Sequence, residues 1–549
     1  MLKPEKDFAI PEMTKIVARA AFPDGSIFLT MRDELGSIFE DESFADLYPA
    51  LGQPAESPAR LALVTVMQFV ENLTDRQAAQ AVQARIDWKY VLGLELTDAG
   101  FDYSVLSEFR SRMIEGGAVQ LLLDKILERC QMRGLLGGKR EQRTDSTHVT
   151  AAIRALNLLE LVGETMRRTL DELARAAPDW LREQLQPEWV KRYGRRFDSY
   201  RLPKTEEKRL ALAETIGRDG FFLLERIYQD ETSQEIKQLP MVDLLRRIWI
   251  QQYYQDDDGL HWRTKKKWGQ PPAGQMISSP DDPDVHYCVK RSTEWTGYKV
   301  HLTETCQDGH PHLITQVETT TSTVHDVKVT QKIQDDLERR GLLPEIQIVD
   351  QGYLETDLLV SSQARGVDLV GPMPSSKSWQ DRQAGAFDHT QFRIDWERRV
   401  ATCPNDKQSA PGVSRKTWRG TPNYAFAFSK NDCLPCDLRA RCSRAKNVGR
   451  TLTIYPEKEY AALQLARQRE DTKEFKELYR KRAGIEGTIS QGVRRMGLRR
   501  SRYLGLERTN FQHVATAAAI NIVRIFYWLS GEVPGQVAQS PFLKLALAS

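Results

Sequence analysis

The chain lacks the features that mark exported and membrane-spanning proteins. Its 549 residues include only seven cysteines, an odd number, and residues 1–7 contain no apolar run of the signal-peptide kind. The most apolar late stretch, 514–529, contains Asn521 and Arg524 and is shorter than the roughly 20 residues that a membrane span needs. We therefore expect a protein of the reducing cytoplasm with no membrane partner.

The chain also lacks a strong net charge and any internal repeat. It has 78 Lys and Arg residues against 75 Asp and Glu residues, which leaves +3 and by itself indicates no nucleic-acid partner. The distribution of charge is more informative, because residues 473–508 hold eleven Lys or Arg and four Glu. A local basic segment can bind phosphates while the whole chain stays near neutral. At this length, two to four domains are expected.

Residues 1–135 are expected to form several short helices. Thr74 and Gln77 have the spacing of a capping box, with Thr at the N-cap and Gln three residues later. Short helices in succession favour a helix-turn-helix-like DNA-binding domain, and a helical packing or dimerisation domain is the alternative. After a predicted strand within 136–154, residues 155–280 have helical spacing and form a predicted insertion. Its basic end, 263–268, either contacts DNA or is a solvated loop.

Residues 281–374 are predicted to form a mixed sheet with helices packed on it, because strand and helix signals alternate. The expected strands are 296–304, 312–319, 345–350 and 367–370, and the expected helices are 326–340 and 356–364. Residues 375–455 break this rhythm with glycine, proline, four cysteines and a strand-like stretch at 391–402. Residues 456–549 return to helix, with long helices expected at about 473–496 and 509–529.

Three acidic residues stand in settings that suit two-metal chemistry. Asp145 lies in a predicted strand, Asp350 ends an apolar strand, and Glu486 lies in the basic helix. Cleavage of a phosphodiester needs an activated nucleophile and a stabilised leaving oxygen, and two divalent ions can provide both. Carboxylates are ligands that Mg²⁺ prefers. Taken singly, each acid has a plainer explanation, such as a turn cap at Asp145 or a surface ion pair at Glu486.

The surroundings of Glu486 strengthen the functional interpretation. Tyr479, Arg482, Glu486 and Val493 fall close to one face of the predicted helix. Gly484 and Gly487 flank the acid and cost up to about 1 kcal/mol each relative to Ala in a helix, so we expect a close backbone approach there. The alternative is an amphipathic helix with a solvated face.

These motifs resemble the DDE transposases of bacterial insertion sequences. The resemblance rests on Asp145-Ser-Thr-His148, on Asp350-Gln-Gly-Tyr353, and on Tyr479, Arg482 and Glu486 at spacings of three and four. Segments 73–77, 109–110, 499–505 and 517–521 are also similar. Together they touch most of the chain outside 155–280. The sequence departs from the family at Val493, where a Lys is frequent and where Arg494 follows one residue later, and in its long insertion between the first two acids.

The resemblance implies roles for the residues that carry it. Asp145, Asp350 and Glu486 would be the catalytic triad and would bind Mg²⁺ or Mn²⁺. Tyr479 and Arg482 would contact the DNA of the transposon end. The expected core is a ribonuclease-H-like α/β fold.

Other basic and histidine residues lie near these motifs. The arginines that follow the Glu486 helix are expected to bind DNA phosphates, or else to form a solvated helix end; they are Arg494, Arg495, Arg499, Arg500 and Arg502. His148 and His325 are expected near the site. They are either structural or able to orient a water or a phosphate.

Four of the cysteines are spaced as metal ligands. Cys433 and Cys436 form a CxxC pair, Cys442 follows six residues later, and Cys403 lies upstream. In a reduced protein four thiolates can hold a structural Zn²⁺ ion in a tetrahedron, and unliganded or redox-active thiols are the alternatives. Cys130, Cys288 and Cys306 have no such spacing and are expected to be packed thiols.

The predicted architecture is a ribonuclease-H-like core with two insertions and a helical N-terminal DNA-binding domain. The core comprises 136–154 and 281–374 and is completed by the helical part 456–549, while 155–280 and the cysteine-rich 375–455 interrupt it. The expected function is a DNA transposase that cleaves the ends of its insertion sequence and joins them to target DNA. Since two inverted repeats must be cut together, we expect a homodimer on double-stranded DNA. The alternatives are a metal-dependent nuclease without strand transfer and a non-catalytic, transposase-derived DNA-binding protein.

Overall fold

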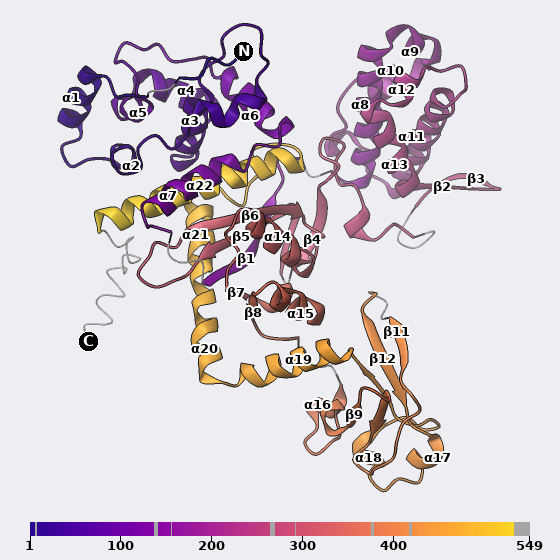
Figure 1. The fold of residues 1–549 in the computed structure, drawn as a ribbon. Helices are drawn as coiled ribbons and strands as arrows, with labels where there is room; N and C mark the ends of the chain where they lie inside the picture. The colour runs from indigo at the N-terminus through magenta and orange to yellow at the C-terminus, as the bar shows by residue number, and fades with distance from the viewer. Residues whose placement is uncertain are drawn as a thin grey trace, which may run out of the picture.

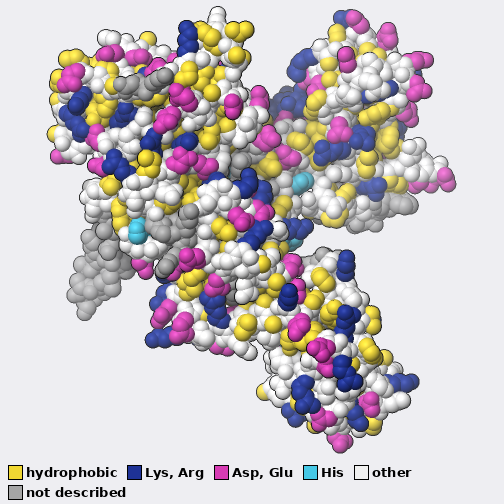
Figure 2. Space-filling view, in the orientation of Figure 1, with side chains coloured by type: hydrophobic (Ala, Val, Ile, Leu, Met, Phe, Trp, Pro, Cys, Tyr) yellow, Lys and Arg dark blue, Asp and Glu magenta, His cyan; other side chains and the backbone are white. Residues whose placement is uncertain are grey.

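The computed structural model describes residues 1–5, 8–136, 141–154, 156–263, 269–290, 292–374, 378–416 and 420–531. Figure 1 shows a central sheet with N-terminal helices above it, a separate group of helices to one side, and an arm below. The helix α22 (Leu506–Ser530) lies between the sheet and the N-terminal helices. Side chains of both charge signs are interspersed on the face shown in Figure 2, as expected from the near-neutral net charge.

The N-terminal part is helical. Its helices are α1 (Glu12–Ala21), α2 (Ile27–Leu35), η1 (Asp41–Leu47), α3 (Pro58–Val70), α4 (Asp75–Ala84), α5 (Ile86–Leu92), α6 (Ser104–Glu115) and α7 (Leu121–Met132). The capping box that opens α4 is confirmed, because Thr74 and Gln77 exchange side-chain and backbone hydrogen bonds. Most of α3 is buried, since it packs against α22 as well as its neighbours.

The central sheet is mixed. Its strands are β1 (Glu141–Thr150), β4 (His286–Lys290), β5 (Thr293–Thr305), β6 (Ile314–Thr321), β7 (Ile346–Val349) and β8 (Asp368–Val370). Their order is β4-β5-β1-β7-β8, and β6 also pairs with β5. β1 is antiparallel to β5 and parallel to β7. The helices α14 (Thr330–Arg339), preceded by η4 (Asp326–Lys328), and α15 (Thr356–Ala364) connect the later strands. The sequence had indicated no strand at β4.

Residues 156–263 form mostly helices around their own apolar core. These are α8 (Leu158–Ala176), α9 (Pro178–Gln184), α10 (Pro187–Tyr193), η2 (Ser199–Arg201), α11 (Glu206–Ile227), α12 (Gln234–Lys237) and α13 (Pro240–Gln252), with η3 (Ala273–Gln275) farther on. A hairpin of β2 (Tyr253–Asp256) and β3 (Gly259–Trp262) follows α13, where only helix was expected. Apart from Arg263, the predicted basic stretch 263–268 lies outside the described residues.

The arm contains the CxxC pair and short elements. These are α16 (Trp379–Arg382), η6 (His389–Gln391), β9 (Arg393–Asp395), β10 (Val400–Thr402), β11 (Val413–Lys416), β12 (Pro422–Ala427), α17 (Lys430–Cys433), α18 (Arg439–Cys442) and β13 (Thr451–Ile454). The strand-like stretch 391–402 is a hairpin of two strands rather than one. Its turn includes Arg399, whose φ is 52°. The helix α19 (Glu457–Glu470) leads back toward the sheet.

The single long helix predicted at 473–496 is wrong. The structure instead has α20 (Lys473–Arg480), the 3₁₀ turn η7 (Lys481–Ala483) and α21 (Gly484–Met496). A tertiary contact accompanies the break, because Nη1 of Arg143 donates a hydrogen bond to the Lys481 carbonyl at 2.6 Å. A side chain at Gly484 would collide with the same guanidinium, 2.0 Å from its Nη1. The close approach expected at Gly484 is therefore confirmed.

Candidate functional site

Two of the predicted acids come from neighbouring strands at the same level. In the parallel pairing of β1 with β7, Thr144 lies opposite Val349, and the next residues are Asp145 and Asp350. Asp145 stays in β1, where it also pairs with Leu302 of β5. Asp350 leaves β7 as the N-cap of η5 (Gln351–Tyr353), and its Oδ1 accepts a hydrogen bond from the Gly352 amide at 2.8 Å.

Arg482 links Asp145 to the third acid. Nη2 of Arg482 lies 2.5 Å from Oδ2 of Asp145, and Nη1 lies 3.3 Å from Oε1 of Glu486. The Asp145 side chain is 12% exposed and the Glu486 side chain 66% exposed, so the acids line a site with a buried and an open side. Burial alone would lower the pKa of Arg482, but Asp145 and the other nearby anionic groups raise it overall.

Burial changes the protonation of Asp145. It raises the pKa of this carboxyl from 3.8 to about 6, although Arg482 and the Ser146 amide act in the opposite direction. The charge of Asp350 raises it further, because two like charges close together disfavour ionisation. The parallel register of β1 and β7, which places the two acids on neighbouring strands, accounts for this effect.

The face of β1 that carries Asp145 receives the C-terminal helical segment at three successive positions. Side chains two residues apart point to the same side of a strand. Arg143 contacts the carbonyl of Lys481, Asp145 contacts Arg482, and Thr147 Oγ1 accepts a hydrogen bond from Arg499 Nε at 2.8 Å. This row of contacts is what brings Glu486 to the sheet.

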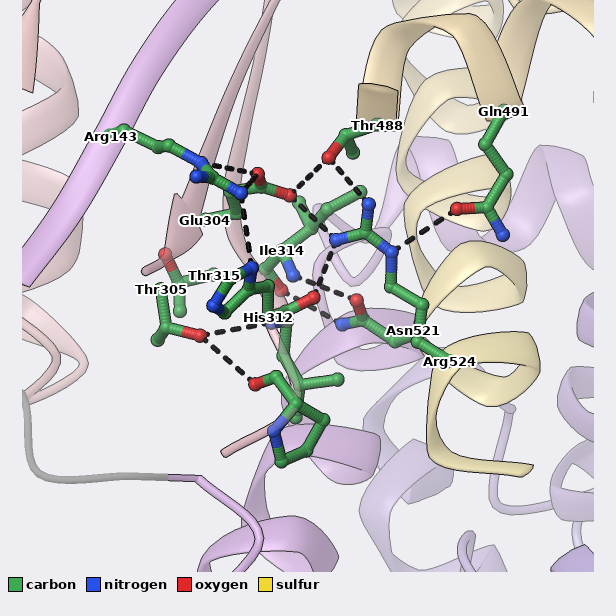
Figure 3. A network of polar contacts seen from close by, with 12 residues as sticks. Arg143, Glu304, Thr305, His312, Ile314, Thr315, Thr488, Gln491, Asn521 and Arg524 are labelled. Atoms are coloured by element: carbon green, nitrogen blue, oxygen red, sulfur yellow. Dashed lines mark hydrogen bonds and ion pairs between the residues drawn. The ribbon is translucent and has the colours of Figure 1, made fainter. Parts of the chain in front are cut away.

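A buried ionic network supports this docking (Figure 3). Glu304 of β5, whose side chain is fully buried, lies 2.6 Å from Arg143 and 2.7 Å from Arg524 of α22. Its Oε2 also accepts a hydrogen bond from Thr488 of α21 at 2.6 Å. Burial alone would raise the pKa of Glu304, but Arg524 and Arg143 outweigh it and lower the pKa. The sequence analysis missed this network; the one available signal was Arg143, two residues before Asp145.

A second polar group lies behind the two strand acids and was also missed. Asp326 Oδ1 is 2.8 Å from Lys299 Nζ, and its Oδ2 accepts a hydrogen bond from Ser146 Oγ at 3.4 Å. The Tyr353 hydroxyl, in the turn after Asp350, is 2.6 Å from the buried His301 ring. Burial lowers the pKa of His301 to about 4, so this ring is neutral at neutral pH.

The remaining predicted site residues differ in their exposure and in their contacts. Tyr479 stacks on Phe475, with ring centroids 5.6 Å apart, and Arg494, Arg495 and Arg500 are exposed. Arg502 is used inside the protein: it donates to the Leu73 carbonyl at 2.8 Å, and its guanidinium lies 4.7 Å from the Phe69 ring centroid.

The structure also gives the surroundings of His148, His325, Gly487 and Val493. His148 packs against Trp295, with ring centroids 5.4 Å apart, and His325 is the N-cap of η4 without a side-chain cap bond. Nothing lies within 4 Å of a side chain built at Gly487, so the close approach expected there is wrong within this chain. Val493 is half-buried.

The donor chemistry of the three acids suits Mg²⁺, since all of them offer carboxylate oxygens. In this structure Asp145 and Glu486 do not meet at a common point. Instead, Arg482 lies between them and pairs with both. Within the described ranges, no three His, Cys, Asp or Glu side chains are arranged to hold a metal ion. The residue types therefore fit a divalent cation, while Arg482 neutralises the acids.

Residues 402–526 match the family model of a transposase DDE domain, and residues 19–112 match that of a transposase domain (DUF772). The two matches together support an insertion-sequence DDE transposase. No curated protein and no solved structure matches it. A DDE domain implies a ribonuclease-H-like fold, which agrees with the mixed sheet of the transposase. The DDE match includes Glu486, whereas Asp145 and Asp350 lie before it. None of the described helices of the transposase is long and apolar enough to cross a membrane.

Proposed function

We propose that this transposase cleaves the ends of its insertion sequence and joins them to target DNA at the site of Asp145, Asp350 and Glu486. One observation carries the proposal: the β1–β7 register sets Asp145 and Asp350 side by side, and Arg482 connects Asp145 to Glu486. Acids that served only as a turn cap and a surface ion pair would have no reason to converge. The convergence also supports the assignment of Asp145 and Asp350, which the family match does not reach.

These three carboxylates would hold Mg²⁺ or Mn²⁺, which when bound would activate the attacking oxygen and stabilise the leaving oxygen. Asp145 must then be ionised, which its burial opposes. Arg482 has to release Asp145 or Glu486 before both can act as ligands. A DNA phosphate is a suitable new partner, since a guanidinium can bind two of its oxygens.

Tyr479 and Arg482 would hold the transposon end beside the acids. The exposed Arg494, Arg495 and Arg500 would bind backbone phosphates, as would Arg499, which contacts Thr147 of β1. These contacts would add affinity without sequence choice. Arg502, which packs against 69–73, would position this segment.

We propose a role for each part of the chain. We assign end recognition to the helices of residues 1–135, catalysis to 136–154, 281–374 and 456–549, and insertions to 155–280 and 375–455. A homodimer would bring two inverted repeats together, so that both ends are cut in one complex.

The test uses purified full-length protein, Mg²⁺, a duplex bearing the element ends that flank its gene, and a second duplex as target. Wild type is compared with Asp145→Ala, Asp350→Ala and Glu486→Gln. The matched control is Glu474→Gln, an exposed acid on the same helical segment. We expect nicks at the inverted ends and joined products with wild type and Glu474→Gln, and neither with the three site variants.

Other outcomes select other functions. Cleavage without any joined product would identify a nuclease. Tight binding by wild type without metal-dependent cleavage would identify a DNA-binding protein. Cleavage that survives Asp145→Ala would place the chemistry elsewhere in the chain.

A further inference from the structure

The structure brings four cysteines from distant positions together in the arm. Cys403 follows β10, Cys433 ends α17, Cys436 lies in the next turn, and Cys442 ends α18. All four line one cavity of about 30 Å³, large enough for a single small ion, and none is in a disulfide. The sequence spacing alone did not establish that Cys403 joins the other three.

Two of these sulfurs already accept hydrogen bonds. The Arg450 amide donates to Sγ of Cys433 at 3.5 Å, and Nδ2 of Asn405 donates to Sγ of Cys436 at 3.6 Å. Hydrogen bonds of this kind can orient a metal-binding sulfur. A thiolate is the form of cysteine that binds metals.

The charges around the cavity indicate an anionic occupant group. Lys407, Arg439 and Arg450 line it, against one acid, Asp432. The Nε of Arg450 is buried without a hydrogen-bond partner among the described residues. A lining with more cations than anions favours an anionic group inside it. Four neutral thiols supply no counter-charge, whereas four thiolates around a divalent cation carry a net charge of −2.

The arm also has little apolar core to hold it together. In the described residues, its buried apolar side chains are Ala425 and the cluster of Phe392, Ala401, Phe426, Phe428, Leu452 and Ile454. Three of the four cysteines pack against this cluster. Small units with cores of this size commonly need a disulfide or a metal ion for stability.

We propose that Cys403, Cys433, Cys436 and Cys442 bind one Zn²⁺ ion as four thiolates and thereby stabilise the arm. Binding replaces four S–H bonds with four Zn–S bonds and releases four protons to solvent, so no oxidant or reductant is needed. Across the described ranges no three potential ligands are arranged to hold a metal ion, so the sulfurs must move closer together. The site is independent of the acids at β1 and β7.

The experiment measures zinc in the full-length protein purified under reducing conditions without chelator. Native mass spectrometry should find about one zinc ion per chain, as expected of a four-thiolate structural site. X-ray absorption at the zinc edge should show sulfur ligands alone, at about 2.3 Å. Zinc absent from the reduced protein even after incubation with zinc salt would overturn the proposal, as would a shell of oxygen or nitrogen.

Variants separate this site from the acidic one. Cys433→Ser and Cys436→Ser should lose the zinc, while Cys288→Ser, a half-buried thiol of β4, and Asp145→Ala should keep it. If the Cys433 and Cys436 variants do not fold, a mercurial reagent titrated into wild type should release the zinc as four thiols react. Zinc retained by Cys433→Ser but lost from Asp145→Ala would assign the metal to the acids and refute the proposal. Loss of transposition without loss of zinc would leave it intact.

Discussion

Nη2 of Arg482 lies 2.5 Å from Oδ2 of Asp145, although 337 positions separate the two residues in the sequence. The contact joins the middle of the 3₁₀ turn η7 to the middle strand of the sheet. In the protein alone, Arg482 supplies the positive charge that the proposed metal ions would otherwise bring. The pair therefore has to rearrange when DNA and metal bind.

Removing the Arg482 guanidinium should impair end cleavage more than DNA binding. A charge-assisted hydrogen bond contributes about 1.5–3 kcal/mol, so Arg482→Gln should slow single-turnover cleavage about tenfold to a hundredfold. Arg482→Lys should rescue little, because an ammonium cannot span two acids or bind a phosphate through two parallel bonds. The control is Arg480→Gln, an exposed residue two positions earlier. Equal losses in the Arg480 and Arg482 variants would contradict the role given to Arg482.

Gly484 and Gly487 should respond differently to alanine. A side chain at Gly484 meets Arg143, which cannot swing away without losing its contacts with Glu304 and Lys481. Gly484→Ala should therefore lower the free energy of unfolding by about 1–3 kcal/mol. Gly487→Ala meets open space and should be neutral or stabilising by up to about 1 kcal/mol. Urea denaturation of both variants checks this, and similar values for the two would refute it.

Glu304 should matter for stability more than any surface acid. Glu304→Gln would leave Arg143 and Arg524 buried without their counter-charge. Breaking a buried ion pair on one side costs about 3–5 kcal/mol. The control Glu318→Gln breaks a pair with the exposed Lys332 and should cost less than about 1 kcal/mol. A loss below 1 kcal/mol for Glu304→Gln, measured by denaturant unfolding, would show that the network does not hold α21 and α22.

The pKa of Asp145 predicts a pH-dependent stability. Burial raises the pKa of Asp145 in the folded state from 3.8 to about 6. The resulting contribution to stability is fully present below pH 4, and it is lost as the pH rises through 6. One pKa unit corresponds to about 1.4 kcal/mol, so Asp145→Asn should stabilise the metal-free protein by about 1–3 kcal/mol at pH 7. At pH 4 the gain should vanish. Asp308→Asn, at a side chain 91% exposed, is the control. Equal effects of Asp145→Asn at both pH values would contradict the shift.

The sequence by itself determined the local features of this transposase. Apolar alternation and capping residues located β1, β5, β7 and most helices. The capping box was predicted at the correct residue, Thr74. The secondary structure around Asp145, Asp350 and Glu486 could be predicted because it depends on a few neighbouring residues. The helices α20 and α21 were located too, but not the break between them.

Only the tertiary structure decided which distant residues meet. Arg143 occupies the space beside Gly484 and binds the Lys481 carbonyl, and local helix propensity, a difference of at most about 1 kcal/mol per residue, could not foretell such contacts. The pairing of β4 with β5 and the burial of Glu304 between two arginines likewise depend on segments far apart in the chain. Arg502 was read as a phosphate ligand because nothing near it in sequence reveals that Phe69 and Leu73 lie against it. Contacts of this kind are fixed by packing and by the pairing of buried charges, which act between elements that only the completed fold brings together.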